Sequence, residues 1–276
     1  MRLSSSNNPQ DGRGMQYHIQ CRPGDVARYV LLPGDPERVD VISSLWDERR
    51  EVAYHREFKT HTGRYMGVEI SVTSTGIGSP SAIIALEELA RIGADTFIRV
   101  GSTGAIQPHI GIGDIIISSA AVRLEGTSKE YVRTEYPASA DYEVLLALIE
   151  AAESLGFRYH VGITASTDSF YLGQSRPGFN GYEQSFSRSI IDDLRRANVL
   201  NFEMESSAIF TVANIYGLRA GSVAIVFANR ITDEFEVVPQ EPVAKVANEA
   251  VRILYEWDQL KERRGKKHFY PSLVGR

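Results

Sequence analysis

The architecture of this protein can be inferred from VEISVTSTGIGSPSAIIALEELARIGADTFIRV, residues 68–100. Its β-branched start predicts a strand, which runs into a glycine-rich turn. Ile83, Leu86 and Ala90 then recur at the spacing of one helical face. Residues 97–100 predict a second, short strand. Strand and helix patterns in alternation are typical of an α/β fold.

The same alternation continues on both sides, from about residue 28 to residue 260. Further strands are expected at residues 28–32, 114–119, 161–165 and 222–227. Three further helices are expected: one ends at Gly156, one ends at Gly217, and the last begins near Pro242. The sequence therefore predicts one α/β domain, with a twisted, largely parallel or mixed central sheet flanked by helices.

Charge and cysteine content exclude several classes of protein. The net charge of −5 argues against broad nucleic-acid binding, which needs a basic footprint. No apolar run approaches the roughly 20 residues of a membrane span, so no membrane partner is expected. Cys21 is the only cysteine, which excludes an internal disulfide and is typical of a reducing compartment. We therefore expect a cytoplasmic protein.

Both ends of the chain are expected to lie outside the folded domain. Residues 1–14 are polar and lack the apolar core of a signal peptide, so they are interpreted as a flexible tail. Residues 15–260 form the expected domain, and residues 261–276 a basic tail. The basic tail is either the solvated end of a helix or a surface that attracts anions or a partner.

Arg99 is an unusual residue in its apolar strand. It stands just before the sequence GSTG at residues 101–104, which predicts a turn. A buried charge costs several kcal/mol unless a partner neutralises it. That partner is either a carboxylate of this protein or an anionic ligand.

Two other arginines also lie beside turns. Gly34 precedes a helix whose first turn carries Arg38, and glycine lets backbone N–H groups approach an anion. Arg56 lies in the segment YHREF. Taken alone, Arg38 is equally explained as a solvated helix residue, and Arg56 as a stacking partner of Tyr54 or Phe58.

Known nucleotide-binding loops do not explain these turns. Gly76 and Gly78 come close to the pattern GxGxxG. However, the next strand carries Arg99 at its end instead of the acidic residue that binds a ribose. A P-loop is also absent from the sequence, because no Gly-Lys-Ser/Thr follows a glycine loop.

Two polar segments complete the candidate site. Glu203 and Glu205 flank Met204. Both carboxylates can approach one site if they lie where a helix begins. Acidic residues also favour a helix N-terminus without any ligand, so that alternative stays open. Carboxylates suit the vicinal hydroxyls of a sugar. In residues 168–178, Phe170 offers a stacking face, and Gln174 with Arg176 can both point inward. That segment is equally consistent with a polar surface loop.

Together these segments resemble the nucleoside phosphorylase-I family, and in particular its members that act on uridine. The resemblance runs from about His18 to Asp258. It rests on VLLPGDPERV, YHREF, STGIGSPS, FIRVGSTGAIQP, ITASTDSFYLGQSR, NFEMES and ANR, found in this order. One departure is GSTG, where relatives commonly carry GTTG; Ser102 keeps the hydroxyl.

The resemblance implies roles for individual residues. Phosphate would be bound by Gly34, Arg38, Arg99, Ser102 and, from a neighbouring subunit, Arg56. The ribose would contact Met204, Glu205 and, from that neighbour, His18 at the 5′-hydroxyl. The base would contact Phe170, Gln174 and Arg176. Catalysis would depend on Arg99, Gln174 and Arg176. A structural monovalent cation such as potassium would contact Glu57, Ile77 and Ser81.

The resemblance also implies an activity and an assembly. The reaction would be the reversible phosphorolysis of uridine to uracil and ribose 1-phosphate in pyrimidine salvage. Inorganic phosphate would be the co-substrate, with no cofactor and no catalytic metal. The assembly would be a hexamer, a trimer of dimers with sites shared across each dimer. Three alternatives stay open: a purine nucleoside phosphorylase, a nucleosidase that uses water, and a non-catalytic nucleoside-binding protein.

Overall fold

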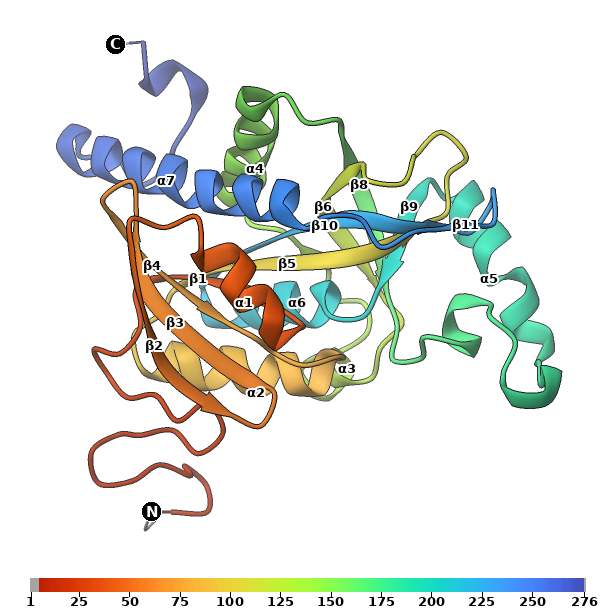
Figure 1. Ribbon diagram of the computed structural model, residues 1–276, viewed down its shortest axis with the longest axis horizontal. Coiled ribbons are helices and arrows are strands. Elements are labelled where there is room, and N and C mark those ends of the chain that lie inside the picture. The colour runs from red at the N-terminus through yellow and green to blue at the C-terminus, as the bar shows by residue number, and fades with distance from the viewer. Residues whose placement is uncertain (1–4, 276) are drawn as a thin grey trace.

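A computed structural model describes residues 5–275. The strands pair into one mixed eleven-stranded sheet with helices on both faces (Figure 1). The strands are β1 (Tyr29–Pro33), β2 (Glu48–His55), β3 (Phe58–Tyr65), β4 (Val68–Thr73), β5 (Thr96–Ala105), β6 (Ile115–Arg123), β7 (Ala138–Ser139), β8 (Tyr159–Ser166), β9 (Val199–Glu203), β10 (Arg219–Asn229) and β11 (Glu234–Phe235). The expected α/β domain with a mixed sheet is thus confirmed.

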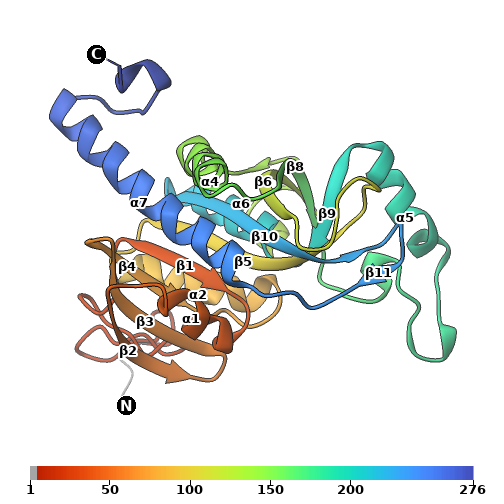
Figure 2. The ribbon, with the colours of Figure 1, turned by 45° about the horizontal axis from the view of Figure 1, so that its top comes forward.

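The helices form two layers around this sheet. The α-helices are α1 (Pro36–Ser43), α2 (Ser79–Arg91), α3 (Thr127–Tyr131), α4 (Tyr142–Leu155), α5 (Ser185–Arg196), α6 (Ser206–Tyr216) and α7 (Glu241–Arg264). Helices α1, α4 and α7 pack into one apolar core, and α2 and α6 into the other. Figure 2 shows that α5 projects from the end of the molecule opposite the C-terminus.

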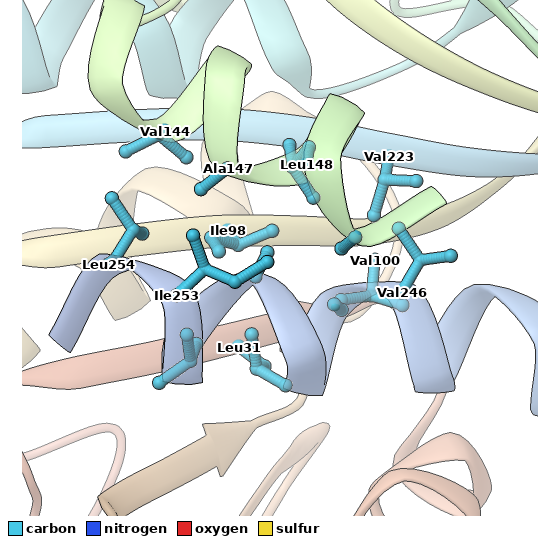
Figure 3. Packing of buried hydrophobic residues seen from close by; sticks show 14 of the residues in the cluster. Leu31, Ile98, Val100, Val144, Ala147, Leu148, Val223, Val246, Ile253 and Leu254 are labelled. Carbon is cyan, nitrogen blue, oxygen red and sulfur yellow. The ribbon is translucent and has the colours of Figure 1, made fainter. Parts of the chain in front are cut away.

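The larger core lies where α4 and α7 meet the sheet (Figure 3). Leu148 of α4 lies near Val223 of β10, Val144 of α4 packs against Gly221 of the same strand, and Ile253 of α7 faces the central strand β5. These side chains are almost completely excluded from water. The apolar residues that recur at helical spacing in α4 and α7 therefore form the faces that these helices bury against the sheet, as the sequence predicts.

The sheet closes on itself around β5. This strand pairs in parallel with β1 and β10 and antiparallel with β9. The pairings β10–β6, β6–β8 and β8–β9 complete a circuit that returns to β5. On its other side the sheet continues through β1, β4, β3 and β2. The carboxyl end of β1 consequently lies beside Val100 in the middle of β5, and the carboxyl end of β9 lies beside the second half of β5.

The structure corrects one local prediction. Residues 101–104 do not form a turn after a four-residue strand, because β5 continues without interruption to Ala105. Residues 101–105 pair with β10, and the last two residues also pair with β9. Hydrogen-bond partners on both sides therefore override the turn preference of glycine, serine and threonine in this segment.

The predicted helix ends are confirmed. Gly156 and Gly217 end α4 and α6 in the left-handed conformation, with φ of 71° and 66°. Pro242 lies in the first turn of α7. That helix extends to Arg264, so the boundary expected at residue 260 falls inside it. Of the expected tails, residues 1–4 and 276 lie outside the described part of the chain.

The hairpin β2–β3 has a tight turn. His55 pairs with Phe58, so Arg56 and Glu57 alone form the connection. Arg56 has φ of 55°, the left-handed conformation that such turns require. Within residues 5–275, no helix combines the length and apolar character needed to cross a membrane.

Candidate active site

A cavity of about 760 Å³ opens at the carboxyl ends of β1, β5 and β9. Every predicted site residue except His18 and Arg56 lines it. The lining residues from the prediction are Gly34, Arg38, Glu57, Ile77, Ser81, Arg99, Ser102, Phe170, Gln174, Arg176, Met204 and Glu205. Segments far apart in the sequence therefore meet at the position where α/β folds hold ligands.

A protein carboxylate neutralises Arg99, the first of the two alternatives considered above. Arg99 Nη2 donates to Glu205 Oε2 at 2.7 Å, and Nη1 donates to the Thr75 hydroxyl at 3.0 Å. The Nε group of Arg99 is buried and has no hydrogen-bond partner among residues 5–275. One strong donor of this guanidinium thus remains available.

Arg38 adds a second positive charge beside Arg99. It is buried in the cavity wall and not a solvated helix residue, and its Nη1 donates to the Val100 carbonyl at 3.0 Å. Burial, followed by repulsion from Arg99, lowers the pKa of Arg38 to about 10. Arg38 therefore remains charged at neutral pH, with the carboxylates of Asp35 and Glu205 nearby. This end of the cavity is suited to an anion.

Two glycines permit the close packing of this end. A Cβ at Gly34 would lie 3.2 Å from Arg99 Nη2 and 3.1 Å from the Gly76 carbonyl oxygen. Gly76 has φ of 69°, and a Cβ there would lie 2.8 Å from Glu57 Cγ. Side chains at either position would displace charged groups of the cavity.

The turn from β9 into α6 brings two carboxylates to the cavity, as expected if the helix begins there. Glu205 Oε1 accepts a hydrogen bond from the Gly78 N–H at 2.6 Å. Glu203 Oε2 accepts from the N–H groups of Glu205 and Ser206, both at 2.8 Å. Burial, with the nearby Glu205 charge, raises the pKa of Glu203. Glu203 thus holds the turn that presents Glu205.

The opposite end of the cavity carries an amide and a guanidinium. Arg176 Nη1 donates to Gln174 Oε1 at 2.6 Å, and the guanidinium lies 4.0 Å from the centre of the Phe170 ring. Burial, followed by repulsion from Arg230, lowers the pKa of Arg176 to about 10. Arg230 holds this segment by donating to the Gln174 carbonyl at 2.8 Å.

Sequence reasoning assigned no role to Arg230 or Thr75, and it considered Glu203 only as a second carboxylate beside Glu205. Arg230 belongs to the ANR segment, but nothing local in that segment indicates its contact with the carbonyl of Gln174. Thr75 follows β4 and reaches Arg99 across the sheet. Polar residues directly after strands of one sheet are the signal that would have found Thr75.

The three residues that the resemblance implies for a cation, Glu57, Ile77 and Ser81, all line the cavity. The Ser81 hydroxyl donates to Glu57 Oε1 at 2.9 Å, and Ile77 is 81% exposed. Within residues 5–275, no group of three or more histidine, cysteine, aspartate or glutamate side chains is placed to hold a metal ion.

His18 and Arg56 lie together outside the cavity lining. The Arg56 guanidinium lies 5.5 Å from the centre of the Tyr17 ring, and its Nη2 donates to the Tyr17 hydroxyl at 3.1 Å. Arg56 therefore stacks on Tyr17 and not on Tyr54 or Phe58. The His18 ring meets the same Tyr17 ring edge-on at 4.8 Å.

Comparison with known proteins defines the family. Residues 28–256 match the phosphorylase superfamily. The uridine phosphorylase of Thermococcus kodakarensis is 71% identical over 271 residues, covering 98% of both chains. That of Escherichia coli is 42% identical over 243 residues, covering 87% of this chain and 95% of the relative. The guanosine phosphorylase of Halorubrum lacusprofundi is 41% identical over 216 residues, covering 78% and 84%. The chain belongs to the phosphorylase superfamily.

Proposed function

We propose that this protein catalyses the reversible phosphorolysis of uridine to uracil and ribose 1-phosphate, as a pentosyltransferase of pyrimidine salvage. One observation carries the proposal. A single cavity holds two neighbouring arginines, one of them paired with Glu205, and also an amide beside a guanidinium. The 71% identity to a uridine phosphorylase over almost the whole chain supports the same reaction.

The anionic co-substrate belongs at the end with excess positive charge. Phosphate binds there to Gly34, Arg38, Arg99 and Ser102, with Arg56 contributed by a neighbouring subunit. The free Nε of Arg99 supplies a donor without breaking its bond to Glu205. The carboxylate of Glu205 and the thioether of Met204 then lie beside the phosphate, where the ribose is held.

The chemistry follows from the two ends of the cavity. Breaking the bond between C1′ and the base nitrogen leaves positive charge on the sugar and negative charge on the uracil. Phosphate stabilises the sugar cation and forms the new C1′–O bond. Gln174 and Arg176 stabilise the electron pair that departs with uracil, while Phe170 stacks on the ring. Stabilising charge that develops in the transition state is the usual source of such catalysis.

A purine substrate is the second candidate, because a guanosine phosphorylase is nearly as similar to this chain as the Escherichia coli uridine phosphorylase. The amide of Gln174 favours the pyrimidine. It presents a donor and an acceptor side by side, as the uracil edge requires.

The assembly is proposed to be a hexamer, a trimer of dimers in the cytoplasm. The position of His18 and Arg56 outside the cavity lining supports sites that are completed by a neighbouring subunit. Glu57, Ile77 and Ser81 supply oxygen atoms of the kind that bind a hard monovalent cation such as potassium.

One assay tests the proposed reaction. Uracil release from uridine is measured with and without phosphate, and we expect release only when phosphate is present. Release in phosphate-free buffer would indicate a nucleosidase. Uridine binding without any release would indicate a binding protein. Faster cleavage of guanosine or inosine than of uridine would assign the chain to purines.

A further inference from the structure

Outside the cavity, one buried carboxylate binds a chain segment that is far from it in the sequence. Glu88 lies on α2 and is 3% exposed. Its oxygens accept from the backbone N–H of His18 at 3.0 Å and from that of Ile19 at 2.9 Å. The His18 ring adds a contact of 2.7 Å through Nδ1. Glu88 therefore fixes both the backbone and the ring of His18.

The chemistry of this contact determines which ring nitrogen carries the proton. An ionised carboxylate only accepts hydrogen bonds, so Nδ1 of His18 must be the donor. In the neutral ring, Nε2 then carries a lone pair and accepts hydrogen bonds. Edge-on contacts with the rings of Tyr17 and Phe58, at 4.8 and 6.3 Å, hold the orientation.

The held ring lies outside the cavity of its own chain and is partly exposed. His18 does not line that cavity, and its side chain keeps 23% of its surface exposed. Tyr17 joins it to Arg56, so one surface offers an acceptor and a guanidinium together. A hydroxyl group beside an anion is the complementary partner. Ribose beside phosphate, bound to another copy of the chain, presents this combination.

We propose that Glu88 is a positioning residue for the reaction. It holds His18 in the Nδ1–H tautomer, so that Nε2 accepts the 5′-hydroxyl hydrogen of the nucleoside bound to the neighbouring subunit. This assignment rests on the proposed function with its shared sites. Glu88 itself acts only through His18.

Two substrates separate positioning from general structural support. We would compare Glu88→Gln with wild type on uridine and on 5′-deoxyuridine, which lacks the hydroxyl. The glutamine keeps the size of the side chain but loses one acceptor oxygen. We expect kcat/KM for uridine to fall about five- to tenfold, the worth of one hydrogen bond, and that for 5′-deoxyuridine to stay within about twofold. The ratio of kcat/KM for uridine to kcat/KM for 5′-deoxyuridine does not depend on how much of each protein preparation is active.

A neighbouring carboxylate provides the matched control. Glu87 lies one residue earlier on α2 and binds the hydroxyls of Tyr131 and Tyr216. Glu87→Gln should leave both substrates unchanged. An equal fall for both substrates in Glu88→Gln would overturn the proposal. So would a further change of the substrate ratio when Glu88→Gln is added to His18→Ala.

A spectroscopic measurement keeps the proposal testable even if the variant folds poorly. Nitrogen-15 NMR of the wild-type protein should show the neutral His18 ring protonated at Nδ1. A ring protonated at Nε2 would overturn the assignment. A wild-type protein that releases no uracil would refute the proposed function instead, because the tautomer measurement does not depend on turnover.

Discussion

Arg99 combines an ion pair within the protein with a buried donor that no described residue satisfies. Its Nη2 binds Glu205, while its Nε has no partner in the described chain. We expect Arg99→Ala to lower kcat/KM for phosphorolysis about a hundredfold or more, the usual loss for one charge-stabilising donor. Steady-state kinetics with varied phosphate would measure the effect. Activity within about threefold of wild type would refute the role.

A lysine variant separates charge from geometry. Arg99→Ala also leaves Glu205 buried without its cation, which costs about 3–5 kcal/mol of stability. Arg99→Lys keeps the charge but lacks the planar set of donors. It should recover most of the thermal stability and little of the activity. If Arg99→Lys keeps nearly wild-type activity, the positive charge alone is sufficient and the planar geometry is not what matters at this position.

Gly34 tests how tightly the anion end is packed. Its φ does not require glycine, so Gly34→Ala acts mainly through a methyl group that would lie 3.2 Å from Arg99 Nη2. We expect a rise in the KM for phosphate of about tenfold with a stability loss of about 1 kcal/mol. Gly12→Ala is the control, because no atom lies within 4 Å of its Cβ. Unchanged phosphate affinity in Gly34→Ala would contradict the packing argument.

The candidate residues that sequence analysis found share one property. Arg99, Gln174 and Arg176 contrast with what surrounds them, an apolar strand or a glycine-rich loop. Arg230 and Thr75 look ordinary in their segments and gain importance only through contacts with distant residues. Such contacts depend on strand order, which local patterns do not determine.

A buried ion network joins α7 to the sheet, and it makes stability depend on pH. Burial raises the pKa of Asp258, but hydrogen bonds from Arg219, Tyr29 and Lys261 outweigh burial and lower it to about 2. The pKa in the unfolded chain is about 3.9, so folding favours the ionised carboxylate above that pH. This stabilisation, about 2 kcal/mol, should be lost as the pH falls from about 4 to about 2.

Asp258→Asn tests the pH effect because the amide cannot ionise. Urea unfolding at pH 5, 4, 3 and 2, at one protein concentration, would give the free energy of unfolding. The variant should be less stable than wild type at pH 5, and the difference should shrink towards pH 2. A difference that stays constant with pH would exclude the ionisation of Asp258 as its cause.

Helices and strands were predictable to different degrees. The helices α2, α4, α6 and α7 follow from apolar spacing, with glycine or proline at their ends, and these signals are local. Helix α5 was missed although Phe186, Ile190 and Leu194 recur at helical spacing in its segment. The extension of β5 was missed because its hydrogen-bond partners come from residues 201–202 and 224–229. Local sequence patterns do not predict the closed circuit of strands for the same reason, because the paired strands are distant in the sequence.

Mixed assemblies test whether sites are shared between subunits. In the proposed assembly, Arg56→Ala would damage the neighbour's site, whereas Arg99→Ala would damage its own. Each variant alone should be nearly inactive. Co-expressed with two different tags, they should regain about a quarter of wild-type activity, since half of the dimers are mixed and carry one intact site. Activity equal to the mean of the two variants would show that no site is shared.

The two-residue turn between β2 and β3 limits how this molecule can change. Glu57 lines the cavity of its own subunit, while the adjacent Arg56 rests on Tyr17 outside it. Adding or deleting one amino acid here would reverse which side chain faces inward. Homologues with an altered hairpin length would therefore lose both contributions in a single event. Point substitutions, in contrast, can adjust either residue independently.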